Sequence, residues 1–272
     1  MSRLPDQPFA KQGGPLVFAH RGWRGKYPEN TLLAFEKAAQ LGVDALEMDI
    51  HATSDGVLVV HHDDTVDRMT DGQGPIKEYS WAALQALEVG HHWTADGGKT
   101  YPFRGMGLRI PALEDVFRRF GEWWINIDIK QREPNIVRPF IEMIRDYKMS
   151  SRMMVGSFHK ENVAEFRQLV PEIATAADSA EVRKLLVLSK LGLGRFYTAN
   201  AKALQIPETY RGVQIITPRF VRDAHRRDVA VHVWTVNETA DMSRLLSVGV
   251  DGIMTDHPDR LLGLLGRLKK EG

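Results

Sequence analysis

The sequence contains no cysteine. Disulfide bonds and thiolate metal sites are therefore excluded, and a metal ion would have to be held by carboxylate, imidazole or carbonyl groups. Oxygen ligands of this kind suit a hard divalent cation such as Mg²⁺ or Ca²⁺. The choice between these two ions depends on cavity size and coordination number, which the sequence does not give.

An excess of one charge is also lacking, because 36 Lys and Arg residues face 35 Asp and Glu residues and the formal net charge is +1. Without a broad basic field, the composition gives no means to recruit nucleic acid or anionic lipid over the whole surface. It favours a small-molecule ligand, and an anion site has to be local.

Long hydrophobic runs are missing as well. No segment reaches the roughly 18 apolar residues that a membrane-spanning helix needs, and the first residues, Met1 to Asp6, lack the apolar core of a signal peptide. We therefore expect a cytoplasmic protein without a transmembrane segment.

What the chain does contain is enough apolar sequence for one large core: 43% of its 272 residues are hydrophobic. Short β-branched or apolar runs alternate with longer helical patterns, which is typical of repeated βα units. We expect a single (β/α)₈ TIM-barrel domain over residues 1–272. The eight predicted barrel strands lie near residues 16–20, 45–50, 123–129, 153–157, 173–177, 212–216, 229–235 and 251–254.

A ninth strand candidate, 57–62, follows the second barrel strand after only a few residues around Asp55-Gly56. A parallel crossover needs about a dozen residues or more, whereas Asp-Gly favours a tight turn. We predict a hairpin return that places His62 beside the acids of the preceding strand.

Residues 63–122 depart longest from the strand and helix alternation, and they are rich in glycine and aromatic residues. We interpret them as a small insertion after the second barrel strand that caps the barrel mouth. Ser80 is expected to cap a helix over 81–88, and another helix is expected between Pro111 and Phe120.

The apolar stretch 185–194 is a second distinctive segment. We expect it to be a helix that faces the core, and the alternative is an apolar wall that admits a lipid chain.

Period-two alternation places Glu47 and Asp49 on one face of their strand, and it places Asp128 and Lys130 on one face of another. Polar groups near the carboxyl ends of barrel strands line the mouth. Three carboxylates that converge there repel one another, and a bound divalent cation is the simplest source of neutralising charge.

Several ordered motifs resemble those of the glycerophosphodiester phosphodiesterase family, over roughly residues 16 to 262. They are His20-Arg21-Gly22, Pro28-Glu29-Asn30-Thr31, Leu46-Glu47-Met48-Asp49-Ile50, His62-Asp63, Asn126-Ile127-Asp128-Ile129-Lys130, Val233-Trp234-Thr235-Val236-Asn237 and the block 249–256. We interpret the last of these as structural.

The resemblance implies metal-dependent hydrolysis of a glycerophosphodiester to sn-glycerol 3-phosphate and an alcohol. It implies that His20 and His62 act as the acid and base pair, in an order that stays open. The phosphate would be bound by Arg21 and Lys130, and the glycerol would lie against Trp234.

For the metal, the resemblance implies Glu47, Asp49 and Asp128 as ligands. The family more often has Glu at the position of Asp128. Because the Asp side chain is shorter by one methylene, a cation there would lie further inward or be reached through a bridging water.

Two other functions stay open. One is lysophospholipase D-type cleavage, which would release lysophosphatidic acid and a head-group alcohol from a lysophospholipid. The other is a barrel that binds phosphodiesters without turning them over. The alcohol, the oligomeric state, and attack by the glycerol hydroxyl as opposed to attack by water are not fixed by the sequence.

Overall fold

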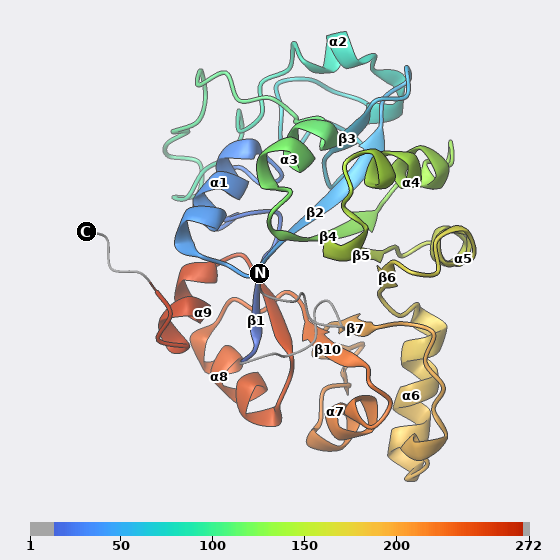
Figure 1. The fold of residues 1–272 in the computed structure, drawn as a ribbon. Helices are drawn as coiled ribbons and strands as arrows, with labels where there is room; N and C mark the ends of the chain where they lie inside the picture. The colour runs from blue at the N-terminus through green and yellow to red at the C-terminus, as the bar shows by residue number, and fades with distance from the viewer. Residues whose placement is uncertain (1–13, 269–272) are drawn as a thin grey trace.

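The computed structural model describes residues 14–268 and shows a nearly closed barrel of eight parallel strands surrounded by helices (Figure 1). The prediction that the first residues lack a signal peptide concerns residues 1–13, which lie outside the described residues. The barrel strands are β1 (Leu16–Ala19), β2 (Ala45–Ala52), β4 (Trp124–Ile129), β5 (Met153–Gly156), β6 (Ala174–Thr175), β7 (Ala203–Ile206), β10 (Ala230–Val233) and β11 (Gly252–Thr255).

The strand order is β6-β5-β4-β2-β1-β11-β10-β7, and a parallel bridge between Ala176 and Ala203 joins the two ends. The predicted (β/α)₈ barrel is therefore confirmed. Between residues 14 and 268, no helix is both long enough and apolar enough to cross a membrane.

The helices that cover the barrel are α1 (Leu32–Leu41), α3 (Leu113–Phe120), α4 (Val137–Asp146), α5 (Lys160–Leu169), α6 (Ser179–Leu191), α7 (Pro218–His225), α8 (Thr239–Val248) and α9 (Pro258–Leu264). Short 3₁₀ turns, η2 (Ser150–Arg152) and η3 (Gly194–Phe196), precede β5 and follow α6. Thr31 caps α1, because its hydroxyl accepts the Ala34 N–H at 3.1 Å.

Apolar side chains fill two layers. Those that point outward from the strands, such as Val17, Met48 and Ile127, pack under the helices in one large cluster. A smaller cluster fills the barrel interior around Phe18 and Met154. The polar side chains of the same strands are thereby left to face the barrel mouth.

The predicted strand over 212–216 is wrong as a barrel strand. Val213–Gln214 forms β9, which pairs antiparallel with β8 (Thr209–Tyr210) in a small exposed hairpin. The sixth barrel strand is β7, which pairs with β10 in parallel register. The β-branched residues 213–216 have the higher strand propensity, but β7 has the buried position between neighbouring strands.

The predicted hairpin return is confirmed. β3 (Leu58–Val60) pairs antiparallel with β2, and Val60 lies opposite Ile50. The peptide N–H of His61 then donates to the Asp49 carbonyl at 3.0 Å, so the hairpin brings the histidine pair to the strand that carries the acids.

The segment after β3 has a hydrophobic cluster of its own, which includes Val66, Ile76 and Leu84. It contains η1 (Ile76–Glu78) and α2 (Trp81–Leu84). Ser80 caps α2, which is shorter than the predicted 81–88 helix. The second helix that we expected there is α3, and its apolar face belongs to the barrel core instead.

The 185–194 stretch forms the second half of α6 and its C-terminal turn. Leu185 is buried in the core, as expected, but Leu191 is 68% exposed. The core-facing prediction therefore holds for only part of this stretch.

Candidate active site

Most of the predicted site residues meet at the carboxyl ends of three adjacent strands. His20 follows β1, Glu47 and Asp49 lie on β2, and Asp128 lies on β4. In the parallel register between β2 and β4, Asp49 lies directly beside Asp128. Neighbouring residues in such a register point to the same face, so the carboxylates share the barrel mouth.

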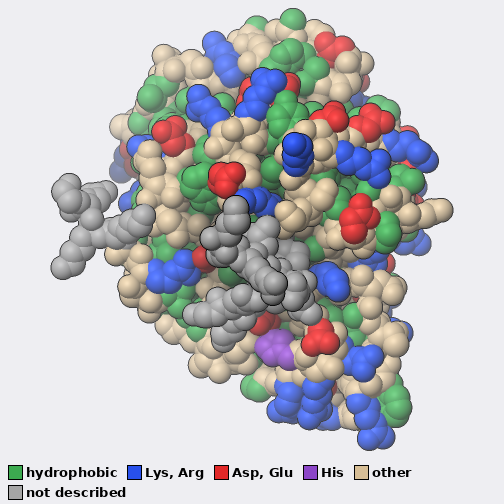
Figure 2. All heavy atoms as spheres, in the orientation of Figure 1, with side chains coloured by type: hydrophobic (Ala, Val, Ile, Leu, Met, Phe, Trp, Pro, Cys, Tyr) green, Lys and Arg blue, Asp and Glu red, His purple; other side chains and the backbone are tan. Residues whose placement is uncertain are grey.

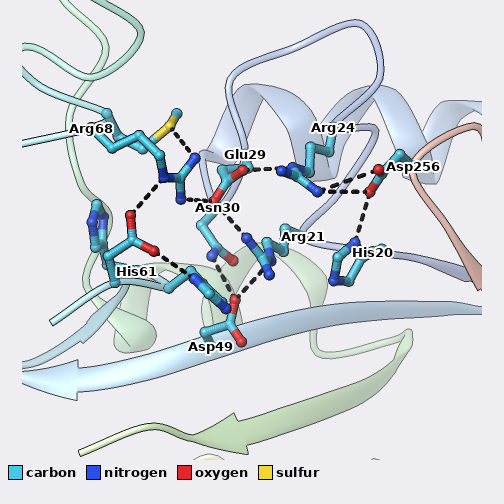
Figure 3. Close-up of polar contacts among 12 residues, drawn as sticks. His20, Arg21, Arg24, Glu29, Asn30, Asp49, His61, Arg68 and Asp256 are labelled. Carbon is cyan, nitrogen blue, oxygen red and sulfur yellow. Dashed lines mark hydrogen bonds and ion pairs between the residues drawn. The ribbon is translucent and has the colours of Figure 1, made fainter. Parts of the chain in front are cut away.

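His20 is held by a carboxylate that the sequence interpretation did not assign to the site. Its Nδ1 lies 2.7 Å from Asp256 Oδ1 (Figure 3), and its Nε2 lies 4.0 Å from Glu47 Oε2. Burial would raise the pKa of Asp256, but the hydrogen bond with His20 and the charges of His20 and Arg24 lower it to about 2. An ionised Asp256 accepts the Nδ1 proton, which leaves Nε2 directed toward Glu47.

Asp256 follows β11, in the block 249–256 that the sequence suggested was structural. Barrel closure could have indicated its role. β11 neighbours β1 in a closed barrel, and Ala19 is in register with Thr255, so the next residue of each strand, His20 and Asp256, also lie side by side. The carboxylate is fixed by Asn237, whose amide donates to Asp256 Oδ2 at 2.9 Å.

Arg21 lies at the site, but its guanidinium is bound to carboxylates. Nη1 donates to Glu29 Oε1 at 2.9 Å, and Nε lies 3.3 Å from Asp49 Oδ2. Its backbone N–H donates to Glu47 Oε2 at 2.9 Å. Burial acts to lower the pKa of Arg21, but the charges of Asp49, Glu29 and Glu47 raise it overall. Arg21 therefore stabilises the acidic cluster from one side.

Lys130 stabilises the same cluster from the other side. Its Nζ lies 2.6 Å from Asp128 Oδ2 and 3.1 Å from Asp49 Oδ1. Burial opposes the charged ammonium, but these two carboxylates raise the pKa of Lys130 overall. The Lys130 ammonium therefore stays positively charged at the mouth.

The three predicted metal ligands differ in how well their charges are satisfied. Burial and the charge of Asp49 raise the pKa of Glu47 to about 7, and burial also raises the pKa of Asp128. Asp128 Oδ1 is buried and has no hydrogen-bond partner. An additional positive charge would stabilise both groups, so the donor set suits a hard divalent cation.

These ligands do not form a preassembled cage. In the described part of the chain, no three His, Cys, Asp or Glu side chains converge closely enough to hold a metal ion. The ammonium of Lys130 lies between Asp49 and Asp128 instead. Metal binding at these residues would therefore require Lys130 to move away from the carboxylates.

His62 has the same arrangement as His20. Its Nδ1 lies 2.6 Å from Asp63 Oδ1, and Arg68 donates to Asp63 Oδ2 at 2.6 Å. The His62 side chain is 30% exposed, and its charge acts on both Asp49 and Asp128. Each histidine therefore has one ring nitrogen fixed by a carboxylate and one left for chemistry.

An aromatic wall lies beside Lys130. The rings of Phe158 and Trp234 meet edge to face, with their centroids 5.9 Å apart. The Lys130 ammonium lies 5.1 Å from the Phe158 centroid, and Phe158 is 72% exposed. Trp234 therefore lies at the mouth, and Phe158 contributes the more exposed ring.

Glu29 connects the site to the insertion. Its buried carboxylate accepts hydrogen bonds from Arg21, Arg24 and Arg68, and Figure 3 shows the three guanidinium groups around it. Burial would raise the pKa of Glu29, but these arginines hold it well below its usual value. Arg68 comes from the insertion, so this carboxylate ties the insertion to the loop after β1.

Comparison with known proteins agrees with this geometry. The profile of the glycerophosphoryl diester phosphodiesterase family matches residues 20–260. A glycerophosphodiester phosphodiesterase of Caldanaerobacter subterraneus subsp. tengcongensis is 33% identical over 92% of this chain and 97% of its own length. A lysophospholipase D of Mus musculus is 27% identical over 91% of this chain and 85% of its own length.

A solved structure of an Oleispira antarctica phosphodiesterase, in complex with the product sn-glycerol-3-phosphate, superposes with a TM-score of 0.76. It is 24% identical and covers 93% of this chain and 97% of its own. At 24% identity this likeness supports the fold alone, whereas the profile match and the 33% identical relative show the family. On these grounds the chain belongs to the glycerophosphoryl diester phosphodiesterase family and is a phosphodiester hydrolase.

Proposed function

We propose that this enzyme hydrolyses a glycerophosphodiester to sn-glycerol 3-phosphate and an alcohol, with His20 and His62 as the acid and base pair and a divalent cation as cofactor. The observation that carries the proposal is the pair of histidines, each fixed through Nδ1 by a carboxylate, beside a cluster of buried acids. Charge neutralisation and proton transfer are the two things that hydrolysis of an anionic diester needs.

The cation would be held by Glu47, Asp49 and Asp128. The buried, unpaired Asp128 Oδ1 and the raised pKa of Glu47 support this assignment. When bound, such an ion neutralises charge on a non-bridging phosphate oxygen and makes an attached hydroxyl more acidic. Lys130, released from the carboxylates, would then bind a second phosphate oxygen.

The two histidines would divide the proton transfers. One accepts the proton of the attacking hydroxyl as the new P–O bond forms, and the other donates a proton to the leaving alcohol as its P–O bond breaks. The attacking group is the glycerol hydroxyl, which gives a cyclic phosphate that water then opens, or it is water itself. Asp256 would stabilise the imidazolium of His20, and Asp63 would stabilise that of His62, while the ring holds the proton.

The aromatic wall supports binding of the glycerol carbons. Trp234 and Phe158 offer apolar faces beside the Lys130 ammonium, so a ligand with a polar phosphate and a short carbon chain fits the two together. The sn-glycerol-3-phosphate held by the Oleispira antarctica enzyme is such a molecule.

The insertion is proposed to cap the mouth, over residues 63–122 with α3 as its barrel-packed end. Arg68 supports this role because it contacts both Asp63, next to His62, and Glu29, in the loop after β1. Movement of this segment would disturb both sides of the site at once.

The experiment that tests the proposal measures release of glycerol 3-phosphate from glycerophosphocholine by metal-stripped protein, alone and with Mg²⁺ or Ca²⁺. We expect release only with a cation. His20→Ala and His62→Ala should each lower turnover by roughly a hundredfold or more and leave metal binding intact. His92→Ala, at an exposed histidine of the insertion, is the matched control. Normal turnover in either active-site variant would remove that histidine from the mechanism.

A second candidate is lysophospholipase D-type cleavage, which the similarity to the Mus musculus enzyme favours. Lysophosphatidylcholine in the same assay separates the two. Release of lysophosphatidic acid without release of glycerol 3-phosphate from the deacylated diester would replace the first proposal, and tight binding of both diesters without turnover would indicate a non-catalytic barrel.

A further inference from the structure

Positive charge is concentrated in one segment of an otherwise balanced chain. Residues 183–227 contain ten Lys and Arg residues and two acids, Glu208 and Asp223, whereas the whole chain has a formal charge of +1. Glu208 is ion-paired with Arg244, and the buried Asp223 is ion-paired with Arg219 and Arg226, so two acids offset part of the charge of ten bases. The exposed surface of this segment is therefore strongly basic.

Apart from Lys202 and Arg211, these basic residues lie on or next to α6, η3 and α7, which are neighbours in the fold (Figure 1). We call this region the α6–α7 surface. Figure 2 shows Lys and Arg side chains gathered at the lower edge of the molecule, where these helices lie. The exposed bases of the surface are Lys190, Arg195, Arg219, Arg222, Arg226 and Arg227.

Large apolar side chains are exposed in the same place. Leu191 at the end of α6 is 68% exposed, Phe196 in η3 is 59% exposed, and Val187 is 50% exposed. The Arg195 guanidinium lies 4.7 Å from the Phe196 ring centroid, so basic and apolar groups are interleaved. Aliphatic and aromatic side chains exposed together in this way mark a contact surface more often than a solvated one.

Close packing makes the apolar and basic parts one rigid surface. Gly192 ends α6 with a φ of 81°, and a Cβ there would lie 2.7 Å from Arg219 Nη2 on α7. A Cβ on Gly194 would lie 2.3 Å from Asp223 Cγ. The turn that carries Leu191 and Phe196 thus packs closely against α7.

A depression of about 380 Å³ lies on the other side of α7, and Arg222, His225 and Arg226 are among the residues that line it. His225 Nε2 lies 2.7 Å from Asp251, directly before β11, so the depression is at the amino end of the barrel. Two guanidinium groups in a depression of this size suit a phosphate head group.

We propose that the α6–α7 surface binds an anionic phospholipid bilayer as a peripheral contact. An acidic protein or a nucleic acid would use the bases but not the exposed Leu191 and Phe196, whereas a lipid interface uses both kinds of side chain. The catalytic residues lie at the opposite, carboxyl ends of the strands. A bilayer-bound enzyme therefore keeps its mouth open to solution, where a deacylated diester is found.

The test is co-sedimentation with vesicles of phosphatidylcholine alone, or of phosphatidylcholine mixed with an equal amount of phosphatidylglycerol, in low-salt buffer. Each basic residue near an anionic surface favours binding roughly fivefold. Arg222→Glu with Arg226→Glu should therefore weaken binding to the anionic vesicles by about twentyfold or more. Leu191→Ser with Phe196→Ser should also weaken it, at unchanged charge.

The matched control is Arg119→Glu with Arg145→Glu, at exposed arginines of α3 and α4. We expect this variant to bind as the wild type does. All variants are first compared by thermal unfolding, which shows whether they fold as the wild type does. Because co-sedimentation measures binding and not turnover, a failure of the proposed reaction would leave the result unaffected.

Four results would overturn the proposal. Three of them are absence of wild-type binding to the anionic vesicles, equal binding to both vesicle types, and equal weakening by the control pair. Loss of binding in the α7 charge variant with full binding in the Leu191 and Phe196 variant would also overturn it, because that pattern fits an acidic polymer instead of a lipid interface.

Discussion

At the level of single residues, His20 and His62 are fixed in the same way although they come from different parts of the barrel mouth. Each Nδ1 faces a carboxylate, at 2.7 Å for Asp256 and 2.6 Å for Asp63. A carboxylate in this position fixes the tautomer and stabilises the protonated ring. The two acids thus act as positioning residues.

Asp256→Asn tests this role. We expect kcat to fall by roughly ten- to a hundredfold, because the imidazolium of His20 loses its charged partner, while KM changes little. For the same reason the pH–rate profile should move to lower pH, a change that a merely structural role would not produce.

The matched control is Asp259→Asn, at an acid of α9 that pairs with Lys26, and this variant should behave as the wild type does. An Asp256→Asn enzyme with wild-type kcat and an unmoved pH profile would limit Asp256 to structure.

Asp256 is the residue of the candidate site that could not be predicted from its local sequence. His20, Glu47 and Asp49 could be located from motif and alternation, because each lies at or next to the strand that carries it. Asp256 reaches the site only because β11 closes the barrel against β1. Its role follows from that long-range pairing.

His61 gives a pH prediction that is independent of catalysis. Burial, together with the neighbouring His51, lowers the pKa of His61 from 6.5 to about 4. Between these values the unfolded chain binds a proton that the folded protein does not, so the free energy of unfolding should fall as the pH drops from 6.5 toward 4. The loss is about 3 kcal/mol at most.

Urea unfolding at several pH values measures this loss. His61→Gln should flatten the pH dependence, whereas His92→Gln, at an exposed histidine, should keep it. The same slope in His61→Gln and in the wild type would show that another group causes the acid destabilisation.

At the level of elements, seven of the eight predicted barrel strands have barrel counterparts, and the reason for the exception is physical. Residues 213–216 are β-branched except for Gln214, yet only Val213–Gln214 forms a strand, in a short exposed hairpin. β7 reads Ala-Leu-Gln-Ile, with little local strand preference, and it becomes a strand because β10 pairs with it. Local propensity could not predict this exchange.

The insertion gives a prediction at this scale through Arg68→Gln. Its guanidinium binds Asp63 and Glu29, each at 2.6 Å, so its removal should loosen the insertion and His62 together. We expect kcat/KM on glycerophosphocholine to fall about tenfold.

Arg109→Gln serves as the control, since this arginine of the insertion donates only to the carbonyls of Leu87 and Leu108 in the described contacts. If both variants kept wild-type kcat/KM, the insertion would have no part in organising the site.

At the level of the whole molecule, the two ends of the barrel differ in charge. The mouth gathers the buried acids Glu47 and Asp49 and the partly buried Asp128, and the opposite end carries Arg222 and Arg226 of the α7 region. A formal charge near zero conceals this division, which is why composition alone predicted no basic surface. Separate ends allow one to bind a cation and an anionic substrate while the other contacts a different partner.

The acidic end leads to the final prediction, which concerns metal binding and stability. Glu47 and Asp128 are held in the folded protein with raised pKa values, so a bound cation should stabilise the fold. A cation at about a hundredfold excess over its Kd adds about 2.7 kcal/mol to the free energy of unfolding. The pKa of Glu47 is about 7, so protons should compete with the cation and the added stability should shrink below that pH.

Thermal unfolding of metal-stripped protein, with Mg²⁺ or Ca²⁺ added at several pH values, measures this effect. Asp128→Asn should weaken the response, because it removes the charge of the carboxylate whose Oδ1 has no other partner. Asp146→Asn, at an exposed acid of α4, should respond to metal as the wild type does. An unfolding temperature that neither ion raises, or an equal response in both variants, would mean that the acids at the mouth are neutralised by Lys130 and Arg21 alone.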